Sequence, residues 1–185
     1  MRTAEEICSQ ALVSLGAEPI DSLAGTSTMA LICQNIYPNC FYSLLAANDW
    51  SFAKKSIQSV GQIVPEYCYY SHQLPIDFLR IIDVYDKSSS RCTFQIQGQN
   101  LKVKSDEIQI SYVGKVNEYE LSEYFIAALA AKLAAQLCLP VTEDPVRARF
   151  LFDQAEAAEK RAFAIDSQQA TPAVIEDFNL IRVRF

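Results

Sequence analysis

Apolar residues recur at helical spacing in the first part of the chain. Between residues 4 and 15 they repeat every three or four positions, and Thr3 with Glu6 forms the S/T-x-x-E pattern that caps a helix start. Gly16 and Pro19 follow, and these residues typically end a helix. The pattern predicts a first helix over residues 4–15.

A second helical pattern occupies residues 26–49, with Thr26 or Ser27 as its N-cap. Pro38 lies inside this pattern. Because proline lacks an amide hydrogen and its ring clashes with the preceding turn, we expect this helix to bend near Gln34.

The spacing changes from helical to alternating between residues 56 and 113. Several segments there place apolar residues at every second position, and Gly98–Asn100 and Ser105–Asp106 supply turns. The pattern predicts a small antiparallel sheet. Its strands are expected at residues 78–86, 92–98, 100–105 and 107–113.

Helical spacing returns at residues 121–138, where leucines form one face and alanines cover much of the rest. Thr142, Asp144 and Pro145 then favour the start of a fourth helix. The stripe expected to be buried on this helix is Ala148, Leu151 or Phe152, Ala155, Ala158, Ala162 and Ile165.

Together these elements predict an α+β fold, a mainly α-helical bundle with a small antiparallel β insertion between its two helical halves. The first half of the bundle is expected at residues 1–53, the β insertion at 54–116 and the second half at 117–170. Residues 171–185 form a separate C-terminal arm.

The only tryptophan, Trp50, lies where the second helical pattern gives way to Lys54 and Lys55. A tryptophan at such a junction usually fills the seam between packed layers, because it buries a large ring while its N–H reaches a polar partner. We therefore interpret Trp50, with Phe52 beside it, as a structural seam.

Composition and charge narrow the class of protein. The net charge is −6, and no segment is basic enough to follow a phosphate backbone. The six cysteines form no CxxC motif, which favours reduced thiols over a zinc site or a disulfide framework. No uninterrupted apolar run is long enough to span a membrane, and acidic residues near the start argue against a signal peptide. We expect a protein made in a cytoplasm, without cofactors.

Candidate catalytic and binding residues are few. His72 has no nucleophile motif around it and is expected to be a surface or packing residue. Acids near a helix start explain Glu118, Glu120 and Glu123 more simply than a metal site does. Three tyrosines could stack on bases, but no Lys or Arg is interleaved with them, so packing is the better interpretation. These tyrosines are Tyr67, Tyr69 and Tyr70. Nothing in the sequence indicates an enzyme.

The order of several segments resembles the head-to-tail adaptor proteins of short-tailed phages, also called tail tubular protein A. The resemblance starts with "ALVSLGAEPIDSL" at 11–23 and "YPNCFYSLLAANDWSFA" at 37–53. It continues with "LPIDFLRI" at 74–81, "FQIQGQNLKV" at 94–103, "ISYVGKV" at 110–116 and "AALAAKLAAQLCLPVTED" at 127–144. It thus covers nearly the whole chain. One departure is that residues 39–42 are Asn-Cys-Phe-Tyr, where the family pattern has a charged pair.

The resemblance implies a structural protein of the virion tail, assembled in the host cytoplasm. Identical subunits, twelve in characterised relatives, would form a ring that docks on the portal protein and receives the tail nozzle, a protein like tail tubular protein B. Tail fibres are a further possible neighbour. DNA would pass through the ring without sequence-specific contacts, which suits a chain without a basic surface.

Two other interpretations remain open from the sequence. One is a non-phage oligomeric scaffold or interaction protein, which would not close into a large ring. The other is a metal-dependent hydrolase that uses Glu118, Glu120 or Glu123. Calorimetry with divalent ions distinguishes the hydrolase, because its site must bind a metal.

The C-terminal arm alternates apolar and basic residues as a strand does. Strand addition to a foreign sheet edge or groove suits this pattern, and the resemblance implies the portal as the partner. Addition to the protein's own sheet at 78–113 is the competing interpretation. The residues assigned to portal binding are Phe178, Leu180, Ile181, Arg182, Val183, Arg184 and Phe185.

Deletion of residues 171–185 should leave the helical bundle folded and remove most of the affinity for the portal. The reason is that the bundle's helical stripes lie outside this segment. Thermal melting of the shortened chain measures the fold, and calorimetric titration with the purified portal measures the affinity. Portal binding equal to that of the full chain would contradict the docking-arm hypothesis.

Overall fold

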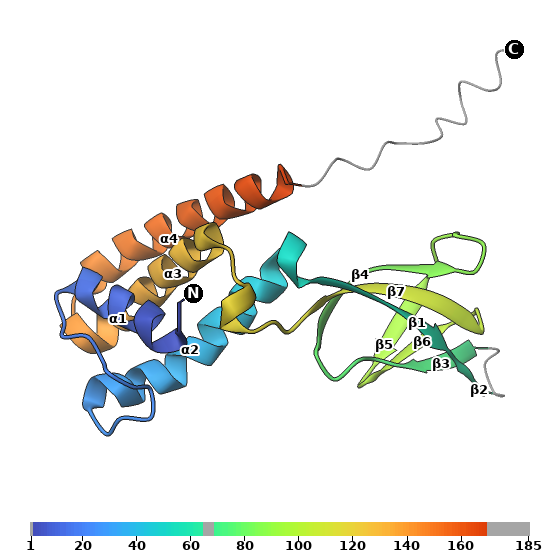
Figure 1. Cartoon of the computed structure of the whole chain (residues 1–185), viewed down its shortest axis with the longest axis horizontal. Coiled ribbons are helices and arrows are strands. Elements are labelled where there is room, and N and C mark those ends of the chain that lie inside the picture. Colours follow the sequence, from blue (N-terminus) through green and yellow to red (C-terminus); the bar gives the residue numbers. More distant parts are fainter. Residues whose placement is uncertain (1, 65–68, 170–185) are drawn as a thin grey trace, which may run out of the picture.

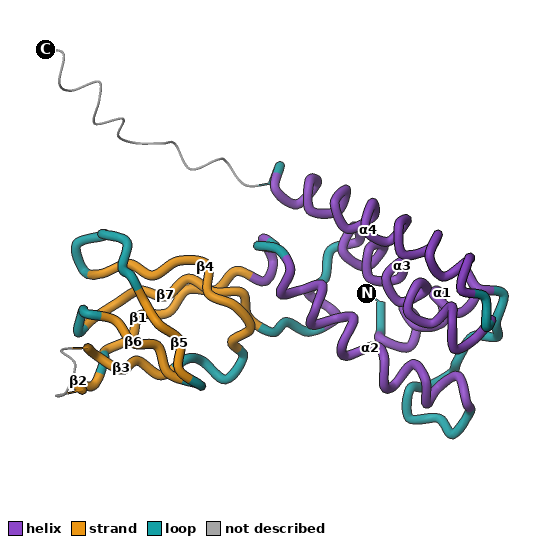
Figure 2. Tube along the Cα trace, turned by 180° about the vertical axis from the view of Figure 1, so that it is seen from behind, coloured by secondary structure: helices purple, strands orange, loops and turns teal. Residues whose placement is uncertain are grey.

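The computed structural model describes residues 2–64 and 69–169. Within these residues, four α-helices form one end of the molecule and seven β-strands in two antiparallel sheets form the other (Figure 1). Seen from behind, helices and strands separate in the same way along the long axis (Figure 2). The predicted α+β class is therefore confirmed. We call the four helices the helical part and residues 54–114 the β part.

The helical part is built around one central helix. Its members are α1 (Ala4–Leu15), α2 (Thr28–Ala47), α3 (Glu123–Thr142) and α4 (Pro145–Ser167). α3 packs against the other three. Large apolar residues of the expected stripe are buried on α3, with alanines beside them that let neighbouring helices approach. The buried members of this stripe are Phe125, Leu129, Leu133 and Leu137.

By length and composition alone, α3 is apolar enough to cross a membrane. This differs from the expectation that no segment reaches that length. The helices α1, α2 and α4 surround it, and 56% of its most apolar window is buried inside the protein. Its hydrophobicity is accounted for by its place in the core of the helical part.

Capping residues set the helix starts as the sequence predicts. At α1 the side chain of Thr3 accepts from the backbone N–H of Glu6, and the side chain of Glu6 accepts from the N–H of Thr3. Ser27 caps α2, and the carboxylate of Asp144 accepts two backbone N–H groups at the start of α4. α2 continues through Pro38 as one helix.

The buried stripe of α4 differs from the predicted one. Ala148, Ala155 and Ala162 are buried as expected, and of the alternatives Leu151 and Phe152 it is Leu151 that packs partly buried against the core. Phe152 and Ile165 are 45% and 47% exposed. Small side chains at seven-residue spacing bring α4 close to α3, so the larger apolar residues lie at the border of the contact or outside it.

The β part contains two sheets rather than the single small sheet that we expected. The strands are β1 (Lys54–Val60), β2 (Gln62–Val64), β3 (Tyr69–Gln73), β4 (Phe78–Asp86), β5 (Phe94–Gln97), β6 (Asn100–Val103) and β7 (Glu107–Gly114). The first sheet has the order β1-β7-β4 and the second has the order β2-β3-β6-β5. The last four strands lie within two residues of their predicted bounds, whereas β1, β2 and β3 had not been predicted.

Gly61 separates β1 from β2, so that one stretch of chain contributes to both sheets. A Cβ atom at this position would lie 2.5 Å from Nε2 of His72 and 2.7 Å from Cβ of Tyr70. Only glycine lets the backbone pass this close to β3. The two sheets then enclose a second apolar core, separate from that of the helical part. Its buried members are Leu74, Ile81, Val84, Leu101, Val103, Ile108, Ile110 and Tyr112.

Trp50 lies fully buried in the core of the helical part, just before the short 3₁₀ turn η1 (Ser51–Ala53). Its Nε1–H donates to the carbonyl of Leu44 at 2.9 Å. The rings of Phe125 on α3 and Phe163 on α4 meet it edge-on at 5.0 and 5.7 Å, and Phe52 lies 6.1 Å away. The indole thus connects α2, α3, α4 and the chain that leads into the β part.

Replacing Trp50 by Ala should lower the free energy of unfolding by about 3–5 kcal/mol, because truncating a large buried aromatic side chain removes its contacts and leaves a cavity. Denaturant titration measures the change. Trp50→Phe is the matched control: it keeps most of the ring contacts and loses the hydrogen bond to Leu44, so a smaller loss is expected. An unchanged denaturation midpoint for Trp50→Ala would contradict the packing role.

Candidate functional site

Polar contacts concentrate where the helical part meets the β part. The carboxylate of Asp166, near the end of α4, is only 2% exposed. It accepts the backbone N–H of Ser51, the hydroxyl of Ser51 and the hydroxyl of Tyr124, each at 2.7 Å. Burial, followed by the hydrogen bond to Asp166 and its charge, raises the pKa of Tyr124. Asp166 therefore joins α4, α3 and η1.

A second contact joins the end of α2 to β4. The guanidinium of Arg80 donates from Nε to the carbonyl of Ala46 at 2.8 Å and also pairs with the carboxylate of Asp49. A cation near the free carbonyls at a helix C-terminus is favourable. Arg80 thus fixes β4 against the last turn of α2.

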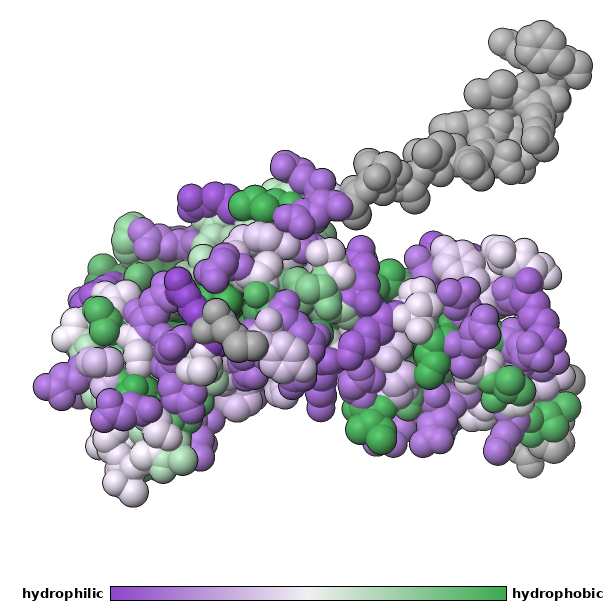
Figure 3. Space-filling view, in the orientation of Figure 1, coloured by the Kyte–Doolittle hydropathy of each residue, from purple (hydrophilic) through white to green (hydrophobic). Residues whose placement is uncertain are grey.

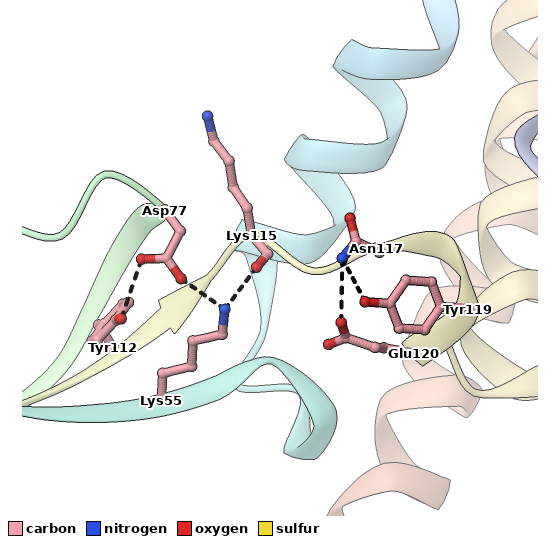
Figure 4. Close-up of polar contacts among 7 residues, drawn as sticks. All are labelled: Lys55, Asp77, Tyr112, Lys115, Asn117, Tyr119 and Glu120. Atoms are coloured by element: carbon pink, nitrogen blue, oxygen red, sulfur yellow. Dashed lines mark hydrogen bonds and ion pairs between the residues drawn. The ribbon is translucent and has the colours of Figure 1, made fainter.

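The third contact is a network inside the β part, next to the junction (Figure 4). The ammonium of Lys55 donates to Oδ2 of Asp77 at 2.7 Å and to the carbonyl of Lys115 at 2.9 Å. The hydroxyl of Tyr112 donates to Oδ1 of Asp77 at 3.2 Å. A Cβ at Gly114 would lie 2.8 Å from Cδ of Lys55 and 3.0 Å from Oδ2 of Asp77, so a larger residue there would require these side chains to shift.

Past this network, the chain enters η2 (Glu118–Glu120). Asn117 donates from Nδ2 to the hydroxyl of Tyr119 at 2.9 Å and to Glu120 at 3.5 Å (Figure 4). Most of the polar groups of the junction thus contact one another, whereas the buried hydroxyl of Ser122 has no hydrogen-bond partner among the described residues. An arrangement of this kind favours one orientation of the helical part relative to the β part.

His72 is buried in the β part, which agrees with the packing alternative and excludes the surface one. Its Nδ1 lies 3.1 Å from the hydroxyl of Ser59, and its Nε2 lies 3.0 Å from the carbonyl of Ser105. Both ring nitrogens are occupied, so this histidine packs and connects strands and has no nitrogen free to act as a base.

Glu118, Glu120 and Glu123, the three acids of the metal hypothesis, contact different residues. Glu118 accepts from the hydroxyl of Tyr37 at 3.3 Å, Glu120 accepts from Asn117, and Glu123 lies 3.7 Å from Arg2. Among the residues that the structure describes, no three His, Cys, Asp or Glu side chains are grouped as metal ligands. The carboxylates thus do not converge on one point.

The remaining candidates serve packing. Tyr69 and Tyr70 are half-buried on β3, and Tyr67 lies outside the described residues. Cys8 and Cys33 are fully buried between α1 and α2. A hydrogen bond to Cys33, together with burial, raises the pKa of the Cys8 thiol, so a reactive thiolate is disfavoured.

The outer side of α3 and α4 exposes large apolar side chains. Leu139 is 54% exposed, Val146 79%, Phe150 59% and Phe152 45%. A groove of about 440 Å³ runs between the two helices and is lined by Leu139, Pro140, Pro145 and Phe152, with Arg149 and Asp153 beside them. On the face drawn in Figure 3, apolar residues also reach the surface of both parts among polar ones. Exposed large apolar side chains beside a groove make this side of α3 and α4 a candidate contact surface for another protein.

No protein-family model matches this chain, and no curated protein matches it either. The residues assigned to portal binding, Phe178 to Phe185, lie outside the described residues. Of the predicted site residues, only Trp50 and Phe52 are described, and they lie together. The sequence had not indicated Asp166, Arg80 or the Lys55 network as parts of a junction.

Neutralising Asp77 should weaken the fold in a pH-dependent way. Burial alone would raise the pKa of Asp77, but the hydrogen bond and charge of Lys55, with the Tyr112 hydroxyl, outweigh it and lower the pKa. A lowered pKa in the folded state stabilises the protein above the unfolded pKa, and this stabilisation disappears as the pH falls through the folded value.

The Lys55 and Asp77 side chains are 38% and 35% exposed, so solvent screens their interaction. We expect Asp77→Asn to cost about 0.2–1 kcal/mol at neutral pH and the difference from the wild type to decrease as the pH falls below about 4. Denaturant titrations between pH 7 and pH 2 measure it. Asp153→Asn is the control, because Asp153 has no ion-pair or hydrogen-bond partner among the described residues. A loss for Asp77→Asn that persists at pH 2 would contradict the account.

Proposed function

We propose that this protein is a structural head-to-tail connector subunit of a phage virion. Copies of the chain form a ring that joins the portal to the tail nozzle and surrounds the DNA channel. The order of the sequence segments supports the phage assignment, and the exposed apolar surface of α3 and α4 supports an assembly of protein subunits.

The observation that carries the proposal is this surface. Leu139, Val146, Phe150 and Phe152 are large, apolar and at least 45% exposed, although the helical part already has a complete core. Placing such residues outward is unfavourable for a solitary protein and favourable for one that buries them against a neighbour. In a closed ring each subunit meets its two neighbours through different surfaces, so α3 and α4 form one side of a heterologous contact.

The polar contacts at the junction fit the same role. A connector transmits position from the portal to the nozzle, which requires its two parts to keep one orientation. Arg80 on β4 bonds to the last turn of α2, and Asp166 on α4 holds η1, which leads into β1. The net charge of −6 suits a wall past which DNA slides, since like charge avoids tight phosphate contacts.

In this proposal the C-terminal arm, with Ile181, Val183 and Phe185 on one face and Arg182 and Arg184 on the other, contacts the portal. A non-phage scaffold would use the same apolar surface for other partners. The portal is therefore the partner that separates the two functions.

Electron microscopy of the chain mixed with its portal should show rings on the portal. Sedimentation of the free chain should show monomers or weak association, because neighbours held on a portal reach a high effective concentration.

Phe150→Asp should abolish the rings, since it places a charge in the apolar contact. Its melting temperature should stay within about 2 °C of the wild type, because Phe150 is largely exposed and surface changes cost little.

Ile76→Asp is the matched control: it adds the same charge at an apolar side chain that is 99% exposed in the β part. This variant should still form rings. Rings formed by Phe150→Asp as readily as by the wild type would refute the assigned contact, and absence of binding to the portal by the unmodified chain would refute the connector function.

A further inference from the structure

The two sheets of the β part end in four edge strands, and three of these edges carry features that discourage further pairing. β1 begins with Lys54 and Lys55. β4 contains Arg80 and Asp83 and shifts its register twice against β7. β2 has only three residues. Charges, bulges and short length are the devices by which proteins block edge strands.

The fourth edge, β5, has none of these devices. Its sequence is Phe94-Gln95-Ile96-Gln97, without charge or proline, and it pairs with β6 in unbroken register. All four residues are exposed. Among the described residues, no strand pairs with its other side. The edge therefore offers free backbone groups to another strand.

The apolar face of the second sheet also continues to this edge. Phe94 lies opposite Val103 and Ile96 lies opposite Leu101, so each pair shares a face of the sheet. Val103 and Leu101 are 1% and 0% exposed, whereas Phe94 and Ile96 are 39% and 51% exposed. The apolar residues of the second core are thus buried on β6 and partly exposed on β5. One more strand beside β5 would cover Phe94 and Ile96.

The C-terminal arm of the chain has the pattern that such a strand needs. Ile181, Val183 and Phe185 alternate with Arg182 and Arg184. Strand addition with the apolar residues on the side of Phe94 and Ile96 would extend the core. The arginines would then lie on the face of Gln95 and Gln97, where β5 presents no like charge directly across.

The place where the described chain ends brings the arm within reach. α4 ends at Ser167. Asp166 accepts a hydrogen bond from the backbone N–H of Ser51, and Ser51 lies three residues before the start of β1. The arm therefore starts at the junction with the β part. Residues 170–180, which precede the pairing segment, can span about 36 Å when extended, and the longest strand of the β part, β4, has 9 residues and a length of about 30 Å.

We propose that residues 181–185 pair with β5 of the same chain and complete the second sheet as its fifth strand. This inference does not depend on the connector function. If the portal binds the same residues, it must displace them from β5, so that the two contacts exclude each other.

Hydrogen exchange on the free full-length chain, without any portal, tests the pairing. Amides of residues 181–185 should exchange at least about tenfold more slowly than in an unstructured peptide, and amides of β5 should be protected with them. Deleting residues 171–185 should remove the excess protection from β5. Exchange of residues 181–185 at the peptide rate would overturn the proposal.

The variant Ile96→Lys places a charge on the covered face and should abolish protection at residues 181–185. Val60→Lys is the matched control, because Val60 is 74% exposed on another edge strand, and it should leave that protection unchanged. Circular dichroism confirms that both variants fold. Protection that survives Ile96→Lys would refute β5 as the receiving edge. Protection that grows with protein concentration would assign the strand to a second copy and refute the intrachain pairing.

Discussion

The buried carboxylate of Asp166 is the constraint on which the arrangement of the two parts depends. A buried charge without a cation is tolerated only when hydrogen bonds replace its water, and Ser51 and Tyr124 supply three of them. Those donors lie on η1 and α3, so the carboxylate can be satisfied only if α4, α3 and the entrance to the β part meet at one point. Trp50 packs beside this point against Phe125 on α3 and Phe163 on α4. The burial of its ring therefore favours the same arrangement of α3, α4 and η1.

Helix positions were predictable from the sequence because their signals are local. The capping box at Thr3 and the cap at Asp144 each depend on residues within one helical turn. The orientation of α4 was not predictable, since alanines occur on most of its sides and any of several stripes can face α3. The buried stripe has seven-residue spacing from Ala148 to Ala162, and Asp166 continues it by one turn. The position of Asp166 at the end of this alanine stripe was therefore the one sign in the sequence that the carboxylate is buried at the junction.

The β part shows where strand prediction fails. β1 has the sequence KKSIQSV and is largely exposed, so it lacks the apolar alternation by which strands are recognised. Its pairing with β7, about fifty residues later in the chain, holds it in place. His72 is a similar case, because its partners Ser59 and Ser105 are 13 and 33 residues away. Contacts between residues far apart in the chain produce no periodic pattern in a single sequence. They can therefore be identified only from the folded structure.

The two exposed surfaces differ in the kind of recognition that they permit. The surface of α3 and α4 offers side chains only, because helix backbones are satisfied internally, so it suits a broad contact with another folded body. The β5 edge offers backbone groups and a narrow apolar strip, so it suits a single extended segment. The junction at Asp166 lies between them and holds the helical part and the β part in one orientation. A partner that fixes α4 therefore also fixes the direction of the β part, whereas a change at β5 reorders one strand without moving the helices.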